Sequence, residues 1–304
     1  MKSKYIGSKI ERYAFTIGNT IILILVAFCT LYPFWNTLAV SFNVATDTTR
    51  GGITFWPRVF TLQNYKAVFS DSIIFHSFFI SASRTIIQTI TGVFFTSMLA
   101  FALSRKKFIF RKIFTMILLL SMYINAGLIP SYFLMRGLHL MNTFLVYVIP
   151  GMISAFNFIV IRTYINSLPE SIIESAQIDG CGDFKIFLQI ILPLCLPVLA
   201  TIALFVAVGS WNAWFDTMIY NSRNVNLHTL QYKLMEFLQS SQSQSKSAAD
   251  IGAMGMSQNA AANMVTPVSI RAAITIIAAA PIIVVYPFLQ RYFITGLNVG
   301  GVKE

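Results

Sequence analysis

The residues best placed to do chemistry with a partner are carboxylates in the stretch SLPESIIESAQIDGCGDFKIFLQIILP, from Ser167 to Pro193. The chain has 11 acidic residues, and four of them gather here: Glu170, Glu174, Asp179 and Asp183. A carboxylate on a protein surface forms its strongest contacts with an arginine, through two parallel charged hydrogen bonds. We therefore expect this segment to lie outside lipid, at a surface where a partner can reach it.

Local signals predict two short helices in this segment, joined by a turn. Ser167 with Glu170, and Ser171 with Glu174, both fit the S-x-x-E capping box that begins a helix. Pro169 would lie in the first helical turn, where a missing N–H is harmless.

The end of the first helix and the start of the second are also marked. Gly180 and Gly182 allow the positive φ that ends a helix, and Asp183 is suited to cap the next one. Pro193 and Pro197 predict a further break.

The composition is that of a membrane protein. The chain has 304 residues, of which 56% are hydrophobic and 11% charged, against roughly 25% charged in a soluble domain. Its mean hydropathy is +0.69. The net charge of +11 is explained by orientation in the bilayer and by anionic lipid, without nucleic acid. The three cysteines show no metal-ligand spacing, so we expect neither a metal site nor a disulfide framework.

Runs of about twenty apolar residues predict an all-α polytopic fold with six transmembrane helices. We expect Pro33 to interrupt the first, and Gly127 and Pro130 to bend the third. We read the first as a retained span and not a cleaved signal peptide. The predicted spans cover about 14–40, 73–103, 113–134, 143–165, 194–220 and 268–289.

Basic residues orient these spans, since Lys and Arg concentrate in short cytoplasmic segments. Thirteen of the 22 lie in the proposed inner segments, most densely in SRKKFIFRK at 104–112. Both termini, 1–13 and 291–304, would then be cytoplasmic, as would the acidic stretch 167–193. The long loops 41–72 and 221–266 would be extracytoplasmic. The middle of the second, SSQSQSKSAADIGAMGMSQNAAAN at 240–263, is small and polar with no helical stripe.

Ionisable and aromatic residues inside the predicted spans suggest a polar path. Arg84 and Asp216 sit at depths where charge is costly and usually faces a bundle interior. Trp211, Asn212 and Trp214 suit a polyhydroxylated ligand, because aromatic faces and amides bind sugars well. The alternatives are an interfacial Asp216, interfacial tryptophan anchors, and an Arg84 that snorkels or pairs with a helix carbonyl.

Two readings are open for the first helix of the acidic stretch. Glu174 and Asp179, with the small residues Ala176 and Gly180, suit docking into a groove on a soluble protein that offers an arginine. Alternatively, Glu174 only caps its own helix and complements the helix dipole.

The pattern ESAQIDG, followed by Phe184, Phe187 and Pro193, resembles the E-A-A-x-x-x-G loop of ABC importer permeases. The runs AFALSRKKF at 100–108, NAGLIPSYFL at 125–134, WNAWF at 211–215 and GLNVGGVKE at 296–304 are similar to MalG-type permeases of carbohydrate importers, within them to the LplC/YtcP-like branch. This resemblance covers nearly the whole chain from about residue 20. Ser175 departs from it, because the family usually has alanine there, and 236–262 has no counterpart that we can map.

The resemblance implies a type I (MetI-like) permease fold in which the acidic loop is a coupling helix seated in a cleft of a cytoplasmic ATPase. Glu174 would pair with an ATPase arginine, Ser175 and Ala176 would permit close approach, and Asp179 with Gly180 would fix the turn. The tail, including Gly300, Gly301, Val302 and Lys303, would reach between two ATPase subunits, and the loop 221–266 would probe a binding protein.

The implied partners are a second, homologous permease in a heterodimer, two ATPase subunits, an extracytoplasmic solute-binding lipoprotein, membrane lipid and an oligosaccharide. Alternating access driven by ATP would be the mechanism, in the plasma membrane of a bacterium with one membrane. The sequence contains no G-x-x-x-x-G-K-[ST], so ATP and Mg would be bound by the ATPase and this chain would carry no cofactor or catalytic residue.

Three other functions compete. One is an ABC permease for a non-sugar solute. Another is an ion-coupled secondary transporter, which predicts repeats and broken helices around midplane ion ligands. The last is a membrane-embedded enzyme, which would need His, Asp, Glu or Cys converging at span depth. The sequence shows neither of these last two patterns.

Overall fold

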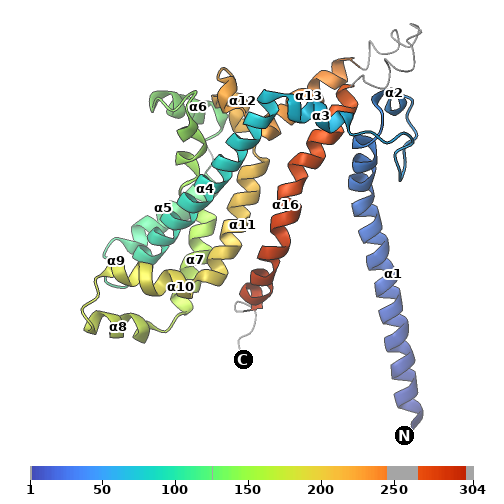
Figure 1. Ribbon diagram of the computed structural model, residues 1–304. Coiled ribbons are helices and arrows are strands. Elements are labelled where there is room, and N and C mark those ends of the chain that lie inside the picture. The colour runs from blue at the N-terminus through green and yellow to red at the C-terminus, as the bar shows by residue number, and fades with distance from the viewer. Residues whose placement is uncertain (1, 125, 245–265, 299–304) are drawn as a thin grey trace. The chain divides into compact units, whose positions relative to one another are not determined.

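The computed structural model describes residues 2–124, 126–244 and 266–298 and is helical, as Figure 1 shows. In these ranges the only extended pairing is an isolated bridge between Asn43 and Phe60. The chain divides into two units, residues 1–70 with 237–277 and residues 71–236 with 278–304, which we describe separately.

The first unit begins with α1 (Lys2–Ser41), followed by α2 (Ala45–Thr48) and α3 (Gln63–Ser70). The predicted interruption at Pro33 is wrong, because α1 continues through it. A proline removes one backbone hydrogen bond, and a long apolar helix keeps the rest. Beyond α1 the chain is held by side-chain amides: Asn36 Nδ2 donates to the carbonyl of Ile53 at 2.7 Å, and Asn64 Nδ2 to that of Ser41 at 2.9 Å.

The second unit is built on α4 (Ser72–Ser104), against which α7 (Ala155–Ser167) and α11 (Leu196–Asn212) pack. Asp71 caps α4 by accepting the N–H of Ile73 at 2.8 Å. The chain before α7 crosses α4 closely, since a Cβ on Gly92 would lie 3.3 Å from the carbonyl oxygen of Gly151. Only a glycine at 92 therefore fits this crossing without movement.

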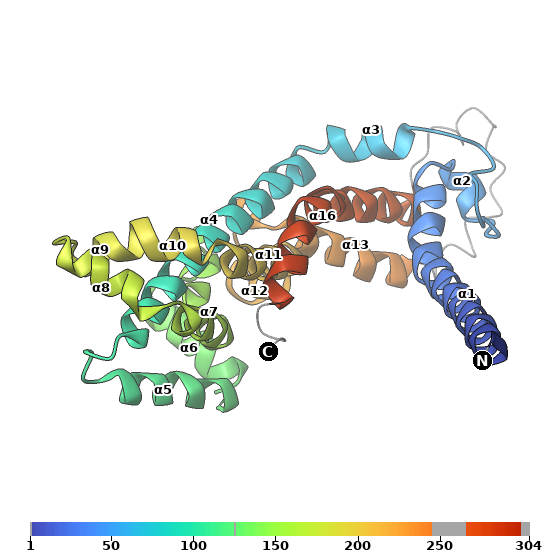
Figure 2. The same cartoon turned by 90° about the horizontal axis from the view of Figure 1, so that it is seen from below.

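The remaining helices of this unit are shorter. They are α5 (Arg111–Tyr123), α6 (Leu128–Gly137), η1 (Phe144–Tyr147), η2 (Ile149–Gly151), α8 (Glu170–Ile178), α9 (Asp183–Ile186), η3 (Phe187–Ile191), α10 (Leu192–Leu194), α12 (Phe215–Tyr220) and η4 (Val225–Leu227). Figure 2 shows α8, α9 and α10 together at one end of the unit.

Two helices have residues in both units: α13 (Leu230–Gln244) and α16 (Pro267–Asn298). The expectation of no helical stripe over 240–263 is wrong for its first residues, because α13 continues to Gln244. The rest of that segment, 245–263, lies outside the described residues.

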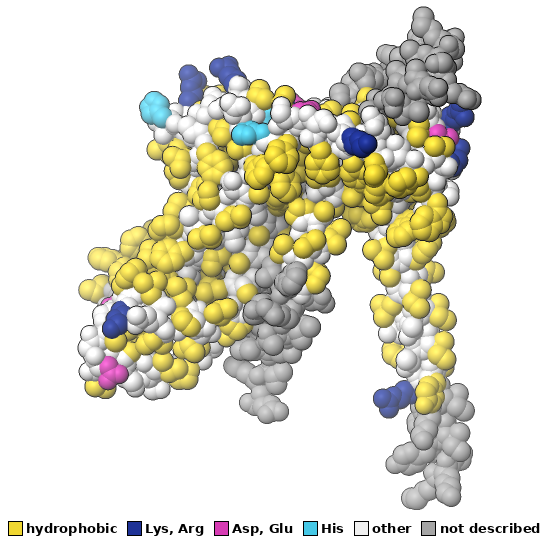
Figure 3. Space-filling model, viewed as in Figure 1, with side chains coloured by type: hydrophobic (Ala, Val, Ile, Leu, Met, Phe, Trp, Pro, Cys, Tyr) yellow, Lys and Arg dark blue, Asp and Glu magenta, His cyan; other side chains and the backbone are white. Residues whose placement is uncertain are grey.

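Among the described residues, three helices are by themselves long and apolar enough to cross a membrane: Glu11–Ser41 within α1, α4, and Pro267–Pro287 within α16. Two bent pairs raise the count to five, Phe144–Gly151 with α7 at 45° and Asp183–Leu194 with α11 at 83°. The predicted third span, 113–134, is divided between α5 and α6, and the φ of 86° at Gly127 lies at the break. Figure 3 shows apolar side chains along the flank of the second unit and charged ones at its ends.

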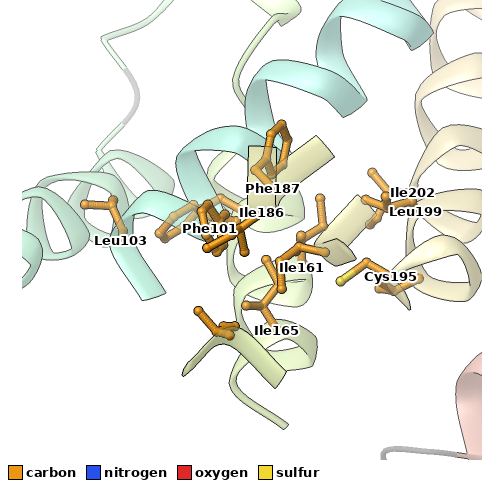
Figure 4. Packing of buried hydrophobic residues seen from close by; sticks show 14 of the residues in the cluster. Phe101, Leu103, Ile161, Ile165, Ile186, Phe187, Cys195, Leu199 and Ile202 are labelled. Atoms are coloured by element: carbon orange, nitrogen blue, oxygen red, sulfur yellow. The ribbon is translucent and has the colours of Figure 1, made fainter. Parts of the chain in front are cut away.

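The core of the second unit lies where α4, α7, η3 and α11 meet. Figure 4 shows Phe101, Ile161, Phe187 and Ile202 converging from these four elements. Phe101 and Phe187 stack with ring centroids 5.8 Å apart. This core fixes the end of the bundle from which the acidic stretch projects.

Candidate coupling surface and buried polar site

The acidic stretch folds as predicted into two helices, α8 and α9, joined by a turn. Gly180 ends α8 with a φ of 78°, and the N–H of Cys181 reaches back to the carbonyl of Ala176 at 3.0 Å. This is the positive-φ closure that favours glycine after a helix.

The predicted capping boxes are wrong. Ser167 is the last residue of α7, and its hydroxyl donates to the carbonyl of Tyr164 at 2.7 Å, so it is not free to cap α8. Pro169 is the N-cap residue itself, and Ser171 and Glu174 both lie within α8. The longer α7 explains this, because it moves the start of α8 to Glu170.

The start of α9 also differs from the prediction. Gly182 has a φ of −71° and is the N-cap residue, so it does not adopt the expected positive φ. Asp183 is the first residue of α9 and not its cap, and there it complements the positive end of the helix dipole.

The two faces of α8 differ sharply. Ile173 and Ala176 are each 6% exposed and belong to the core, whereas Glu174, Ser175 and Asp179 are exposed. The small side chain of Ala176 therefore permits close packing inside this chain. The exposed face carries the carboxylates that a partner would meet.

The start of α8 is tied to the basic loop that precedes α5. Lys106 Nζ donates to Glu170 Oε2 at 2.5 Å, and this hydrogen bond, with the nearby positive charge, lowers the pKa of the Glu170 carboxyl. A cleft of about 380 Å³ is lined by the sequence neighbours of Lys106, Arg105 and Lys107, and among others by Phe184. Phe184, predicted from the motif, is 60% exposed at this cleft.

The segment after α9 turns sharply into α11. It passes through the π-helical turn η3 and α10, and then meets α11 at an angle of 83° beside Cys195. Pro193 and Pro197 flank this bend, so the predicted break is confirmed. The segment Asp183–Leu194 therefore runs almost at right angles to α11.

The second candidate site is a buried ion pair between Arg84 of α4 and Asp216 of α12. The guanidinium contacts both carboxylate oxygens, with Nη1 to Oδ1 at 3.1 Å, and also donates to the carbonyl of Ala213 at 3.2 Å. The side chains are 3% and 25% exposed. Arg84 also lies 4.5 Å from the ring centroid of Tyr147, a cation–π distance.

Further polar contacts join α4 to the chain after α11. Ser77, Ser81 and Arg84 recur at helical spacing and are each at most 2% exposed. Ser81 Oγ accepts the backbone N–H of Leu230 at 2.8 Å, which joins α4 to the chain after α11. The Tyr147 hydroxyl, on η1, donates to the carbonyl of Leu227 at 2.7 Å. Arg84 and Ser81 therefore fasten α4 to residues 213–230.

The predicted aromatic residues lie in different environments. Trp211 is 6% exposed, and its indole Nε1–H donates to the carbonyl of Ala278 at 2.8 Å. Trp214 is half-buried and Asn212 is exposed, with Asn212 Oδ1 3.5 Å from Gln231 Nε2. Trp211 is thus packed inside the unit, whereas Asn212 is accessible from outside.

Some predicted residues cannot be placed. Gly300, Gly301, Val302 and Lys303 lie outside the described residues. In the part that is described, no three His, Cys, Asp or Glu residues are close enough to hold a metal ion.

Sequence reasoning missed Lys106 as a partner of Glu170, and Tyr147 as a partner of Arg84. It also missed the serines of α4, although small polar residues at helical spacing within an apolar span were a usable signal. Nothing local in the sequence pairs Lys106 with a residue 64 positions away.

Comparison with known proteins identifies the family of this chain. Residues 92–299 match the family described as binding-protein-dependent transport system inner membrane component. The chain belongs to that family. It is therefore a multi-pass membrane protein and the permease subunit of a binding-protein-dependent ABC importer, non-catalytic, with ATP bound by an ATPase partner.

Individual relatives agree with this assignment. The chain is 31% identical over 282 residues to the polygalacturonan/rhamnogalacturonan transport system permease protein YtcP of Bacillus subtilis, covering 92% of this chain and 95% of YtcP. It is 33% identical over 290 residues to protein LplC of the same organism, covering 95% of each. A subunit of a bacterial ABC transporter involved in the import of the acidic polysaccharide alginate superposes on this permease with a TM-score of 0.82 at 28% identity, covering 92% of this chain and 97% of that one.

Proposed function

We propose that this permease imports oligosaccharides and that it does so as a six-span subunit forming one half of a heterodimeric pathway. The names of YtcP and of the alginate transporter refer to polysaccharides, which supports a sugar cargo. The α5–α6 pair, bent at Gly127, would form the third span along the chain and bring the number of spans from five to six. Both termini would lie in the cytoplasm, as the basic residues of 1–13 and 104–112 require.

The observation that carries the coupling role is the exposed face of α8. Glu174, Ser175 and Asp179 face outward from a helix whose other side is anchored in the core through Ile173 and Ala176. An ATPase arginine would meet Glu174 there, and movement of the ATPase would reach α11 through the rigid bend at Cys195. In such a transition, packed helices move as rigid bodies between two conformations.

A sugar path would use Asn212 and Trp214, which are accessible at the end of α11. Trp211, Arg84 and Asp216 would position that end by packing and ion pairing. The remaining partners would be a second permease, two ATPase subunits and an extracytoplasmic binding lipoprotein that contacts 221–266. The tail 299–304 would contact the ATPase pair.

The coupling role is tested with Glu174→Lys in the assembled transporter. We expect the variant to co-purify with the second permease but to lose the ATPase, because the charge that holds the arginine is reversed. Asn166→Lys, which adds a cation at an exposed position near the end of α7, is the matched control and should retain the ATPase. Full ATPase retention and transport by Glu174→Lys would show that Glu174 does not couple.

The cargo is tested separately, by measuring ATP hydrolysis of the complex in vesicles with its binding protein. We expect an oligosaccharide to stimulate ATP hydrolysis. Comparing acidic with neutral oligosaccharides then identifies which of these two classes is the cargo. Stimulation by a non-sugar solute with none by either sugar would overturn the oligosaccharide assignment while leaving the coupling role intact.

A further inference from the structure

Three cationic side chains surround one cavity at the end of the unit where α5 begins and α7 ends. The cavity has a volume of about 400 Å³ and is lined by Arg111, Lys112, Thr115, Met116, Leu119 and Arg162. All six residues belong to the second unit, and α5 and α7 are packed against each other there.

The charges around this cavity are not neutralised within the described part of the chain. Its lining contains no acidic residue, and none of the three cations forms an ion pair with a described residue. Arg111 is close enough to Arg162 to repel it. Like charges held together without a counter-charge destabilise a folded chain, so an anion in the cavity would relieve the repulsion.

Arg162 carries a second sign of a missing ligand. Its Nε is buried and has no hydrogen-bond partner among the described residues, while its guanidinium lies 5.9 Å from the ring centroid of Phe158. Buried donors are nearly always satisfied, and an unsatisfied one calls for an explanation. A phosphate oxygen accepts from a guanidinium in the required geometry.

The rest of the lining consists of Met116, Leu119 and Thr115, whose hydroxyl donates back to the carbonyl of Arg111 at 2.6 Å, and the surroundings are apolar. No residue of α5 is buried, and Ile113, Met116 and Ile117 are each more than half exposed. Arg162 lies five residues before the end of α7, about 7–8 Å along the axis at 1.5 Å per residue. The cations thus lie directly beside a surface that suits acyl chains, and in the proposed orientation they would stand near the headgroups.

We propose that this cavity binds the phosphate of an anionic phospholipid, whose acyl chains lie along α5. In the proposed orientation the cavity opens to the cytoplasmic leaflet, where anionic lipid is available. The lipid would brace α5 against α7, next to the loop that Lys106 ties to α8. The lipid site stands on the cavity and its charges and does not require the sugar assignment.

The test uses the whole transporter reconstituted in nanodiscs of phosphatidylcholine with a minor fraction of phosphatidylglycerol. Native mass spectrometry then counts the phosphatidylglycerol that stays bound after transfer to detergent. Each cation near a membrane surface contributes about 1 kcal/mol, so Arg162→Gln should weaken retention about fivefold and Arg111→Gln/Arg162→Gln by more than twentyfold. Arg162→Lys should retain most of the lipid, because it keeps the charge.

The control is Lys107→Gln, which removes a cation from the same loop region but outside this cavity, and it should retain lipid as the unaltered protein does. Co-purification of the second permease and the ATPase shows that each variant is assembled. Equal retention by the double variant and the unaltered protein would overturn the proposal. It would also be overturned if inorganic phosphate displaced the lipid at millimolar concentration, or if cross-linking placed the second permease in the cavity.

Discussion

Arg84 and Asp216 are 132 positions apart, yet the guanidinium of one contacts both carboxylate oxygens of the other. The pair joins α4 to α12, the helix that follows the Trp-Asn pair at the end of α11. An ion pair that is this well shielded is costly to break, because removing one partner leaves the other charge without compensation.

The first prediction concerns this pair. Asp216→Asn should destabilise the complex by about 3–5 kcal/mol, since Arg84 is only 3% exposed and would lose its counter-charge. Arg84→Met combined with Asp216→Asn should recover part of the loss. Thermal unfolding of the purified complex measures both, and a double variant no more stable than Asp216→Asn would contradict a specific pairing.

The second prediction separates packing from a pathway role at the tryptophans. Trp211→Phe removes the donor to the Ala278 carbonyl and should cost about 1 kcal/mol of stability. It should leave sugar-stimulated ATP hydrolysis per assembled complex unchanged. Trp214→Ala should instead lower that stimulation. If Trp211→Phe abolished stimulation without a change in thermal stability, Trp211 would belong to the path.

The third prediction contrasts neighbouring positions on α8. Ala176→Leu overfills the core beside Ile173 and should destabilise the permease by about 1–3 kcal/mol. Ser175→Leu lies on the exposed face and should change stability by less than about 0.5 kcal/mol. The same Ser175→Leu should weaken ATPase binding, because the bulk enters the docking face. Pull-down and thermal unfolding measure the two effects independently.

The fourth prediction concerns pH. The hydrogen bond from Lys106 lowers the pKa of the Glu170 carboxyl below its ordinary value of 4.5. The ion pair is therefore complete above pH 4.5, and it is lost as the pH falls through the lowered pKa. Lys106→Gln should raise the pKa of Glu170 towards 4.5. Carbon NMR titration of labelled glutamate in the complex measures the pKa of Glu170 directly. Lys185→Gln, which removes a different lysine, serves as the control. An unchanged titration in Lys106→Gln would contradict the pairing.

The sequence alone predicted much of the helical layout. The long apolar run of 73–103 is observed as α4 within one residue at each end, because continuous hydrophobicity and the Asp71 cap are local signals. The helix–turn–helix of the acidic stretch and the bend between Pro193 and Pro197 are likewise local, since glycine and proline act on their own backbone.

The caps of that stretch were mispredicted although the local sequence holds the reason. The residue before a proline disfavours the helical conformation, so α7 continues to Ser167 and is capped by Leu168, directly before Pro169, and the Ser167 hydroxyl bonds back to the carbonyl of Tyr164. By contrast, the sequence marked Ala176 as small, but only the packing of α8 against the core shows that this smallness serves the chain itself.

What the sequence by itself determined is a helical membrane protein with one acidic, exposed segment and charged residues at unusual depth. What only the tertiary structure decided is which charged side chains meet: Arg84 pairs with Asp216, Lys106 pairs with Glu170, and Arg111 lies close to Arg162. Helix propensity and hydropathy act over a few residues, whereas a charge finds its partner through the packing of helices distant in the chain.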